Sequence, residues 1–110
     1  MKRIMWIEQK GDQIVGPARI GWAEVKDRGK RIEYRGKTYR SLRGAGFKAN
    51  FYEVESREQY WISGCRKDGH DALYNTEAEI DEDALEEYWV EVRNLPQNIH
   101  LRRFRASGKN

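Results

Sequence analysis

The fold is decided by the stretch RIEYRGKTYRSL, residues 31–42. Ile32 and Tyr34 alternate with charged residues up to Arg35, which is the two-residue period of a strand with one buried face. Gly36 and Lys37 have the composition of a tight turn, and Thr38–Leu42 follows as a second strand. The stretch therefore predicts an antiparallel hairpin near the middle of the chain.

Short apolar segments lie on both sides of this hairpin. Each is rich in β-branched and aromatic residues and is bounded by turn residues, which is typical of strands. We predict further strands at Lys2–Gln9, Ala18–Lys26, Phe47–Val54 and Gln59–Gly64. Six strands spaced by roughly ten residues favour a curled antiparallel sheet or small barrel over parallel βαβ units. The region Cys65–Glu79 has no clear period and is predicted to be an extended loop.

A single helix is predicted over Asp81–Asn94. Asp81 is a suitable N-cap residue, and Asn94 with Pro96 marks the end. One apolar stripe is formed at helical spacing by Ala84, Leu85, Tyr88, Trp89 and Val92. The fold class is therefore α+β: a small bent antiparallel β-sheet, or an SH3-like barrel, with one C-terminal α-helix packed over one opening.

Length and composition suit one small domain. The 110 residues predict a single globular domain over residues 1–96 and a basic C-terminal tail over 97–110, with at least the last five residues disordered. No apolar run is long enough for a membrane span or a signal peptide. Cys65 is the one cysteine, which excludes an internal disulfide and a cysteine-rich zinc site. We expect a cytoplasmic protein.

Charge is divided along the chain. Residues 1–50 carry 13 basic and 5 acidic side chains, residues 51–96 carry 4 and 13, and residues 97–110 carry 4 basic side chains and no acid. The local balances are +8, −9 and +4. Such a chain either pairs its two halves in the fold or presents a basic face to one partner and an acidic face to another.

Several motifs resemble a family of small bacterial proteins that has no established function. The resemblance spans residues 4–95 and leaves the basic tail outside. It implies a bacterial intracellular protein and no catalytic residue. The motifs are GPARIG at 16–21, FKAN at 47–50, YWISG at 60–64, KDG at 67–69, and IDED at 80–83 with EYW at 87–89.

The leading functional hypothesis is a non-catalytic domain that binds nucleic acid. Cations attract phosphate and rings stack on bases, and both kinds of side chain alternate in the predicted strands. The tail would add affinity, and Phe47 is a further ring that could stack. The proposed contacts are Arg31, Tyr34, Arg35, Lys37, Tyr39, Arg40, Arg43 and Lys48. An ordinary solvated sheet face is an equally plain interpretation of the same residues.

Two alternatives remain open. The first is a protein-interaction module, such as an inhibitor or immunity-like factor, that covers a basic partner with Glu82, Glu86 and Glu87 of the acidic helix. The second is a small enzyme with a site near Lys48, Asp68 and His70. A pocket for it would be assembled from Lys48, Asn50, Lys67, Asp68, His70, Asp71 and Tyr74.

The polar loop that contains His70 has weak signals for chemistry. Asp68, His70 and Asp71 could ligate a metal or move a proton, but a polar turn is the favoured interpretation. Cys65 beside Arg66 could be a thiolate nucleophile with His70 as its base, although a buried cysteine is the simpler interpretation. The sequence therefore predicts no metal, no cofactor and no catalytic residue.

Overall fold

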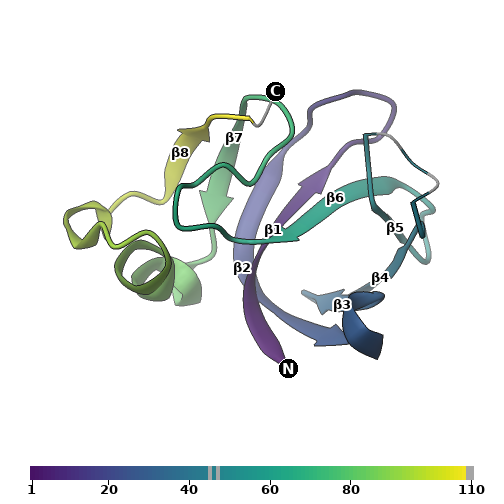
Figure 1. The fold of residues 1–110 in the computed structure, drawn as a ribbon, viewed down its shortest axis with the longest axis horizontal. Helices are drawn as coiled ribbons and strands as arrows, with labels where there is room; N and C mark the ends of the chain where they lie inside the picture. The colour runs from purple at the N-terminus through teal and green to yellow at the C-terminus, as the bar shows by residue number, and fades with distance from the viewer. Residues whose placement is uncertain (45, 47, 109–110) are drawn as a thin grey trace.

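The computed structural model describes residues 1–44, 46 and 48–108. Six strands close into an antiparallel barrel in the order β1-β6-β5-β4-β3-β2, with β2 returning to β1 (Figure 1). A single turn of 3₁₀-helix, η1 (Asp27–Gly29), joins β2 to β3. The barrel strands are β1 (Lys2–Gln9), β2 (Ala18–Lys26), β3 (Arg31–Tyr34), β4 (Lys37–Ser41), β5 (Phe51–Glu53) and β6 (Gln59–Gly64).

All six strands predicted from the sequence are present, and three have the expected bounds. The fifth is shorter than predicted: β5 begins at Phe51, whereas the prediction began at Phe47, which lies outside the described residues. Asn50 replaces the missing strand pairing with its side chain, whose Nδ2 donates to the Ile62 carbonyl at 2.7 Å. The Ile62 N–H donates to Asn50 Oδ1 at 2.8 Å, so the amide group acts as one further rung of the sheet.

The first strand is buried on both faces, which explains its unbroken apolar run. Met5 and Ile7 point into the barrel, whereas Ile4 and Trp6 point to a second core outside it. The barrel interior is a cluster of Met5, Ile7, Ala23, Ile32, Tyr34, Tyr39, Phe51, Tyr60 and Ile62. Alternation along β3 and β4 therefore places rings inside and charges outside, as the period of two requires.

Two further strands extend the sheet beyond the barrel. β7 (Thr76–Ile80) pairs in parallel with the start of β2, and β8 (Arg103–Ala106) pairs antiparallel with β7. The expectation of an unbroken loop over Cys65–Glu79 is thus wrong at its end, and the segment predicted as a tail contributes a strand. Each segment is short and highly charged, and its few apolar side chains are buried only after pairing. The prediction of disorder for Lys109 and Asn110 lies outside the described residues.

The helix is present where the sequence predicts it, but it is not C-terminal. Helical turns run from Glu82 to Val92, first as a 3₁₀ turn, η2 (Glu82–Ala84), and then as a wide π-helical stretch, η3 (Glu87–Val92). Asn94 ends the helix in the left-handed region at φ 55°. A further 3₁₀ turn, η4 (Pro96–Asn98), then leads into β8. None of the described helices is long and apolar enough to cross a membrane.

The helix covers the outer side of the sheet and not an opening of the barrel. In Figure 1 it lies beside β7 and β8, away from β3 and β4. Ala84, Tyr88 and Trp89 are buried there, and Leu85 and Val92 pack against the same core. The sheet supplies Ile4, Trp6, Ala18, Ile20, Ala78, Ile80 and Ala106. The predicted apolar stripe is confirmed, and its partner is the face that β7 and β8 enlarge.

Candidate functional site

The outer barrel face carries a row of polar side chains that crosses five strands. Backbone pairing sets Lys26 opposite Arg31, Arg31 opposite Arg40, Arg40 opposite Tyr52 and Tyr52 opposite Gln59. Directly opposed residues point to the same side of a sheet, and the neighbouring positions Ile32, Tyr39 and Phe51 face the interior. We call Lys26, Arg31, Arg40, Tyr52 and Gln59 the outer row.

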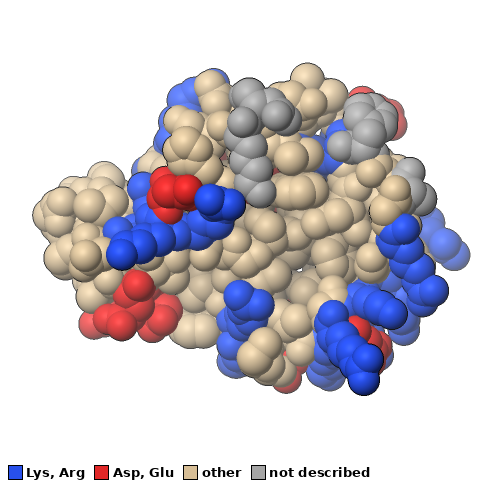
Figure 2. All heavy atoms as spheres, in the orientation of Figure 1, with Lys and Arg blue, Asp and Glu red and all other residues tan. Residues whose placement is uncertain are grey.

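The outer row places one aromatic ring among cations. Tyr52 is half-buried, and the guanidinium carbon of Arg57 lies 5.9 Å from the centre of its ring. Figure 2 shows Lys and Arg gathered toward the lower right of the molecule, the region of β3 and β4 in Figure 1. The sequence did contain a signal for Tyr52, because Phe51 and Tyr52 must face opposite sides of their strand.

The rings that sequence reasoning proposed for stacking are enclosed in the barrel. Tyr34 is 5% exposed and Tyr39 is 3% exposed, and both belong to the interior core. Neither can offer a ring face to a base. Burial raises the pKa of Tyr39, and nearby Tyr60 raises it further. The correction follows from the same alternation that predicted the hairpin, since Tyr34 faces the opposite side of β3 from Arg31, and Tyr39 the opposite side of β4 from Arg40. Phe47 lies outside the described residues.

Some of the proposed cations bind acids or carbonyl groups of the chain, and others take part in no ion pair. Arg31 Nε lies 3.7 Å from Glu33 and 3.9 Å from Asp27, and Lys48 Nζ donates to the Gly11 carbonyl at 2.6 Å. Arg35 Nη1 donates to Asp81. Within the described residues, no ion pair involves Lys37, Arg40 or Arg43, and all three side chains are exposed.

Asp81 binds the barrel and does not cap the helix with its side chain. Its Oδ1 accepts from Arg19 Nη2 at 2.6 Å and from Arg35 Nη1 at 3.2 Å, and its Oδ2 accepts from the Tyr34 hydroxyl at 2.6 Å. Space for the carboxylate comes from Gly21, where a Cβ would lie 2.1 Å from Oδ2. The predicted capping bond is therefore wrong, because charged partners and a phenol compete for the same oxygens.

The residues of the hypothetical enzyme pocket make separate contacts. Lys48 and Asn50 form hydrogen bonds with backbone groups, as described above. The centre of the Tyr74 ring lies 5.7 Å from Lys10 Nζ. Lys67 and His70 are exposed. Asp71 is buried, and its Oδ1 accepts from the Arg66 N–H at 2.7 Å. Lys48 lines a hollow with Gly11 and Arg57, and Asp68 lines a different one with Arg66 and Lys67.

The acidic loop residue Asp68 behaves as a turn residue. Arg66 binds its carboxylate through Nε at 3.1 Å and Nη2 at 2.9 Å, and the His70 N–H donates to Oδ1. The hydrogen bonds from Arg66 are the main reason that the pKa of Asp68 lies well below its usual range.

Burial, with a contribution from Asp71, raises the pKa of the Cys65 thiol, so the thiolate form that a nucleophile needs is disfavoured. The described residues contain no cluster of three metal-ligating side chains.

The acidic face of the helix is partly used inside the molecule. Glu82 forms an ion pair with Arg102, and Glu79 lies 3.4 Å from Arg103 and 3.5 Å from Arg19. Glu86 is exposed and Glu87 is half-buried. The chain thus neutralises Glu79 and Glu82 with its own arginines and leaves Glu86 exposed.

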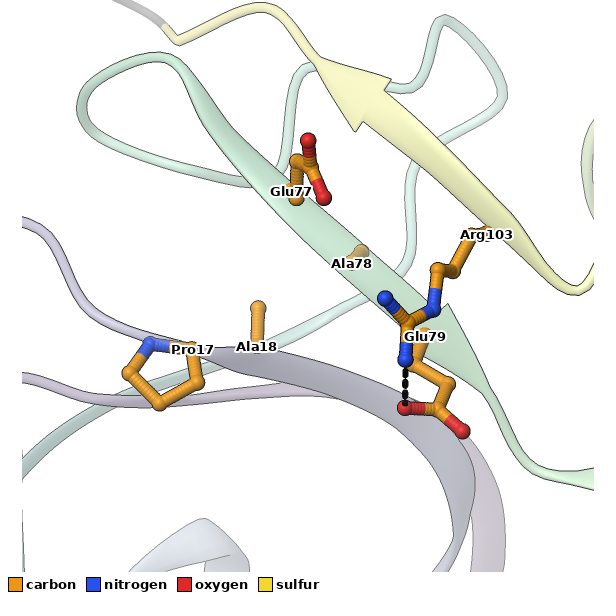
Figure 3. Close-up of a pocket in the computed structure, with 6 residues that line it drawn as sticks. All are labelled: Pro17, Ala18, Glu77, Ala78, Glu79 and Arg103. Carbon is orange, nitrogen blue, oxygen red and sulfur yellow. Dashed lines mark hydrogen bonds and ion pairs between the residues drawn. The ribbon is translucent and has the colours of Figure 1, made fainter.

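Two hollows adjoin each other at the start of β2. One, of about 180 Å³, lies over β2 and β7 and is crossed by the Glu79–Arg103 ion pair (Figure 3). The other, of about 300 Å³, opens onto one end of the barrel interior. They share Pro17, Ala18 and Glu79. The larger one is also lined by Ile7, Gln9, Arg19, Lys37, Tyr39 and Tyr60, and we call it the barrel mouth.

Comparisons with known proteins identify no relative. Neither a protein-family model, nor a curated protein, nor a solved structure matches this chain. The resemblance of residues 4–95 to a family of small bacterial proteins stays an expectation.

Proposed function

We propose that the protein binds single-stranded nucleic acid on its outer barrel face. The single observation that supports this most is the outer row, in which Arg31, Arg40 and Tyr52 lie directly opposite one another on three adjacent strands. A backbone phosphate is attracted by the arginines, and a base stacks on the half-exposed ring. Arg43 is exposed and follows the end of β4, and we assign it a further phosphate contact.

The electrostatics of this face favour a polyanion. Arg40 and Arg43 are not paired with acids of the described chain, so no internal ion pair has to break before phosphate binds. Acidic side chains lie near Arg31 and Lys26, namely Asp27 and Glu33. We therefore assign the main phosphate contacts to Arg40 and Arg43 and a weaker one to Arg31.

The test is fluorescence anisotropy with a short labelled oligodeoxythymidine at several salt concentrations. Three phosphate contacts give a slope of log affinity against log salt of about −2 for a single strand. Arg40→Glu with Arg43→Glu should remove measurable binding, whereas Lys67→Glu with Arg105→Glu changes the net charge equally away from the outer row and should leave most of it. Equal loss in the two double variants would reject the outer row as the binding surface.

A second variant separates stacking from charge. Tyr52→Ala should weaken binding by about 1–3 kcal/mol without changing the salt slope, and Tyr52→Phe should bind like the original protein. If Tyr52→Phe weakened binding as much as Tyr52→Ala, the ring would not be stacking on a base.

A protein partner is the alternative that the exposed acids keep open. Glu86 and Glu87 take part in no ion pair among the described residues. Both belong to the helix, which lies away from β3 and β4 (Figure 1). A basic partner that survives nuclease treatment, and that is released by Glu86→Lys with Glu87→Lys, would favour this function over nucleic-acid binding. We also propose that the barrel is SH3-like and that the protein is bacterial and cytoplasmic.

A further inference from the structure

The last strand of the sheet, β8, has one unpaired edge. The sheet order ends β2-β7-β8, so among the described residues β8 has a strand neighbour only on the side of β7 (Figure 1). The Ile80 N–H donates to the Arg102 carbonyl at 2.8 Å. Because bonded and unbonded pairs alternate along an antiparallel ladder, Phe104 is the next residue that bonds to β7. The backbone N–H and C=O groups of Arg103 and Arg105 therefore point to the free edge.

The side chains of these two arginines lie on the same side of β8, and both are exposed. Arg105 takes part in no ion pair among the described residues. Arg103 pairs with Glu79 at 3.4 Å, and its side chain is 71% exposed. Such an exposed ion pair contributes little, so it does not prevent Arg103 from binding a second acid. Free backbone groups and cations are thus presented along one edge.

Charge alternates across the strands that lead to this edge. Arg19 of β2 lies opposite Glu79 of β7, and Glu79 lies opposite Arg103 of β8. Both contacts are ion pairs, and Figure 3 shows the second. Glu77 is likewise opposite Arg105. The sheet ends on two cations, so an acid on a further strand would continue the alternation with opposite charges side by side.

A second copy of β8 fits this edge poorly. Antiparallel strands bond through directly opposed residues, so any register that pairs Arg103 and Arg105 of one copy with those of another places arginine opposite arginine. Like charges directly opposite each other destabilise a sheet, and charged side chains commonly protect edge strands from pairing with themselves. The charges of β8 therefore disfavour a second copy and favour an acidic strand.

We propose that the free edge of β8 binds an extended acidic segment of a partner protein, which adds one antiparallel strand to the sheet. Two acids of the segment, separated by one residue, lie opposite Arg103 and Arg105. The residue between them lies opposite Phe104, whose ring is half-buried and packs on Trp89, so an apolar side chain there enlarges the outer core. The segment has the pattern acid, apolar, acid. This site does not depend on the outer row, which lies on the barrel strands.

The proposal is tested by NMR titration of the ¹⁵N-labelled full chain with a synthetic peptide, the acetylated and amidated pentapeptide Val-Glu-Val-Glu-Val. It should give saturable shifts at the amides of Arg103 and Arg105 and slow their exchange with solvent. A control peptide with glutamine in place of glutamate lacks the charges and should bind about tenfold more weakly. A control with N-methyl groups on both glutamates keeps the charges but cannot donate to the β8 carbonyls, and it should not saturate.

A matched pair of double variants tests the two arginines. Arg103→Gln with Arg105→Gln should weaken binding of the glutamate peptide about tenfold. Lys2→Gln with Lys30→Gln removes the same charge at exposed positions outside β7 and β8, and it should leave binding unchanged. Unchanged spectra without peptide verify the fold of each variant.

The proposal is overturned if the glutamate peptide does not saturate at Arg103 and Arg105, or if either control peptide binds as tightly. Equal binding by the two double variants would also overturn it, because the arginines would then not recognise the acids. Shifts of the same amides with protein concentration alone would mean that a second copy occupies the edge, which likewise contradicts the proposal.

Discussion

The Tyr34 hydroxyl donates a hydrogen bond of 2.6 Å to Oδ2 of Asp81, which joins the last residue of β3 to the residue that precedes the helix. The bond lies at a fork in the sheet. β2 pairs with β7 as far as Ile20 and with β3 from Glu24 onward, so the two neighbours separate in between. Asp81 fills the fork and holds the barrel to the unit formed by β7, the helix and β8.

Removing this carboxylate should destabilise the whole domain. Asp81→Ala leaves the buried Tyr34 hydroxyl without its acceptor and leaves Arg19 with only Glu79 and the Tyr34 oxygen. We expect a loss of about 2 kcal/mol, reduced from the value for a fully buried pair because Arg19 is 36% exposed. Tyr34→Phe should cost about 1 kcal/mol. Urea denaturation of both single variants and of the double variant gives the coupling free energy between Asp81 and Tyr34. Strict additivity would show that the two groups do not act together.

Gly21 should tolerate no side chain while Asp81 is present. An added Cβ would lie 2.1 Å from Asp81 Oδ2 and 2.9 Å from Tyr34 Cε1. Gly21→Ala should therefore cost about 1–3 kcal/mol of unfolding free energy. In an Asp81→Ala background the closest contact is absent, and the added cost of Gly21→Ala should fall. The same cost in both backgrounds, measured by urea denaturation, would contradict the proposed packing.

Alkaline pH should weaken the fold through its buried tyrosines. Burial, assisted by the Asp81 carboxylate, raises the pKa of Tyr34 from its usual 10 to about 12. Below pH 10 the phenol keeps its proton in both states, so the stabilisation is fully present. Between pH 10 and 12 the unfolded chain releases the proton and the folded chain does not, so unfolding becomes easier as pH rises. Tyr34→Phe should show a smaller fall in urea midpoint over this interval, and an equal fall would contradict this assignment.

The hairpin was predictable because its strands bury alternate residues, and β1 because its apolar run is unbroken; both patterns are visible without knowledge of the fold. The buried ion pair of Glu8 and Lys10 was not predictable. Its atoms Oε2 and Nζ lie 2.8 Å apart, although both residues look like ordinary surface charges in the sequence. Trp6 Nε1, from the same side of β1, also donates to Glu8. The Gly16 N–H donates to Glu8 as well, and it reaches the carboxylate only when the loop before β2 folds back.

The candidate site shows the same limit. Sequence reasoning found the cations of β3 and β4, because charge is a property of single residues. It chose the rings wrongly at Tyr34 and Tyr39, since a ring in a strand is equally suited to a core and to a surface until the inward face is known. Alternation sets Phe51 and Tyr52 on opposite sides of β5, and the pairing of β5 with β4 shows that Tyr52 is the outer one, because it lies opposite Arg40.

Residues beyond the helix should be necessary for full stability, because β8 completes the outer core. The Phe104 ring has its centre 5.3 Å from that of Trp89 and 5.8 Å from that of Tyr88. Phe104→Ala should lower the unfolding free energy by about 2 kcal/mol, less than for a fully buried phenylalanine because the ring is half-buried. Arg105→Ala, on the exposed side of the same strand, is the matched control and should change it by no more than about 0.5 kcal/mol. Thermal and urea unfolding measure the unfolding free energy of both variants. An equal, small loss in the two would contradict the role of β8 in the core, because truncation of a core residue must cost more than truncation of an exposed one.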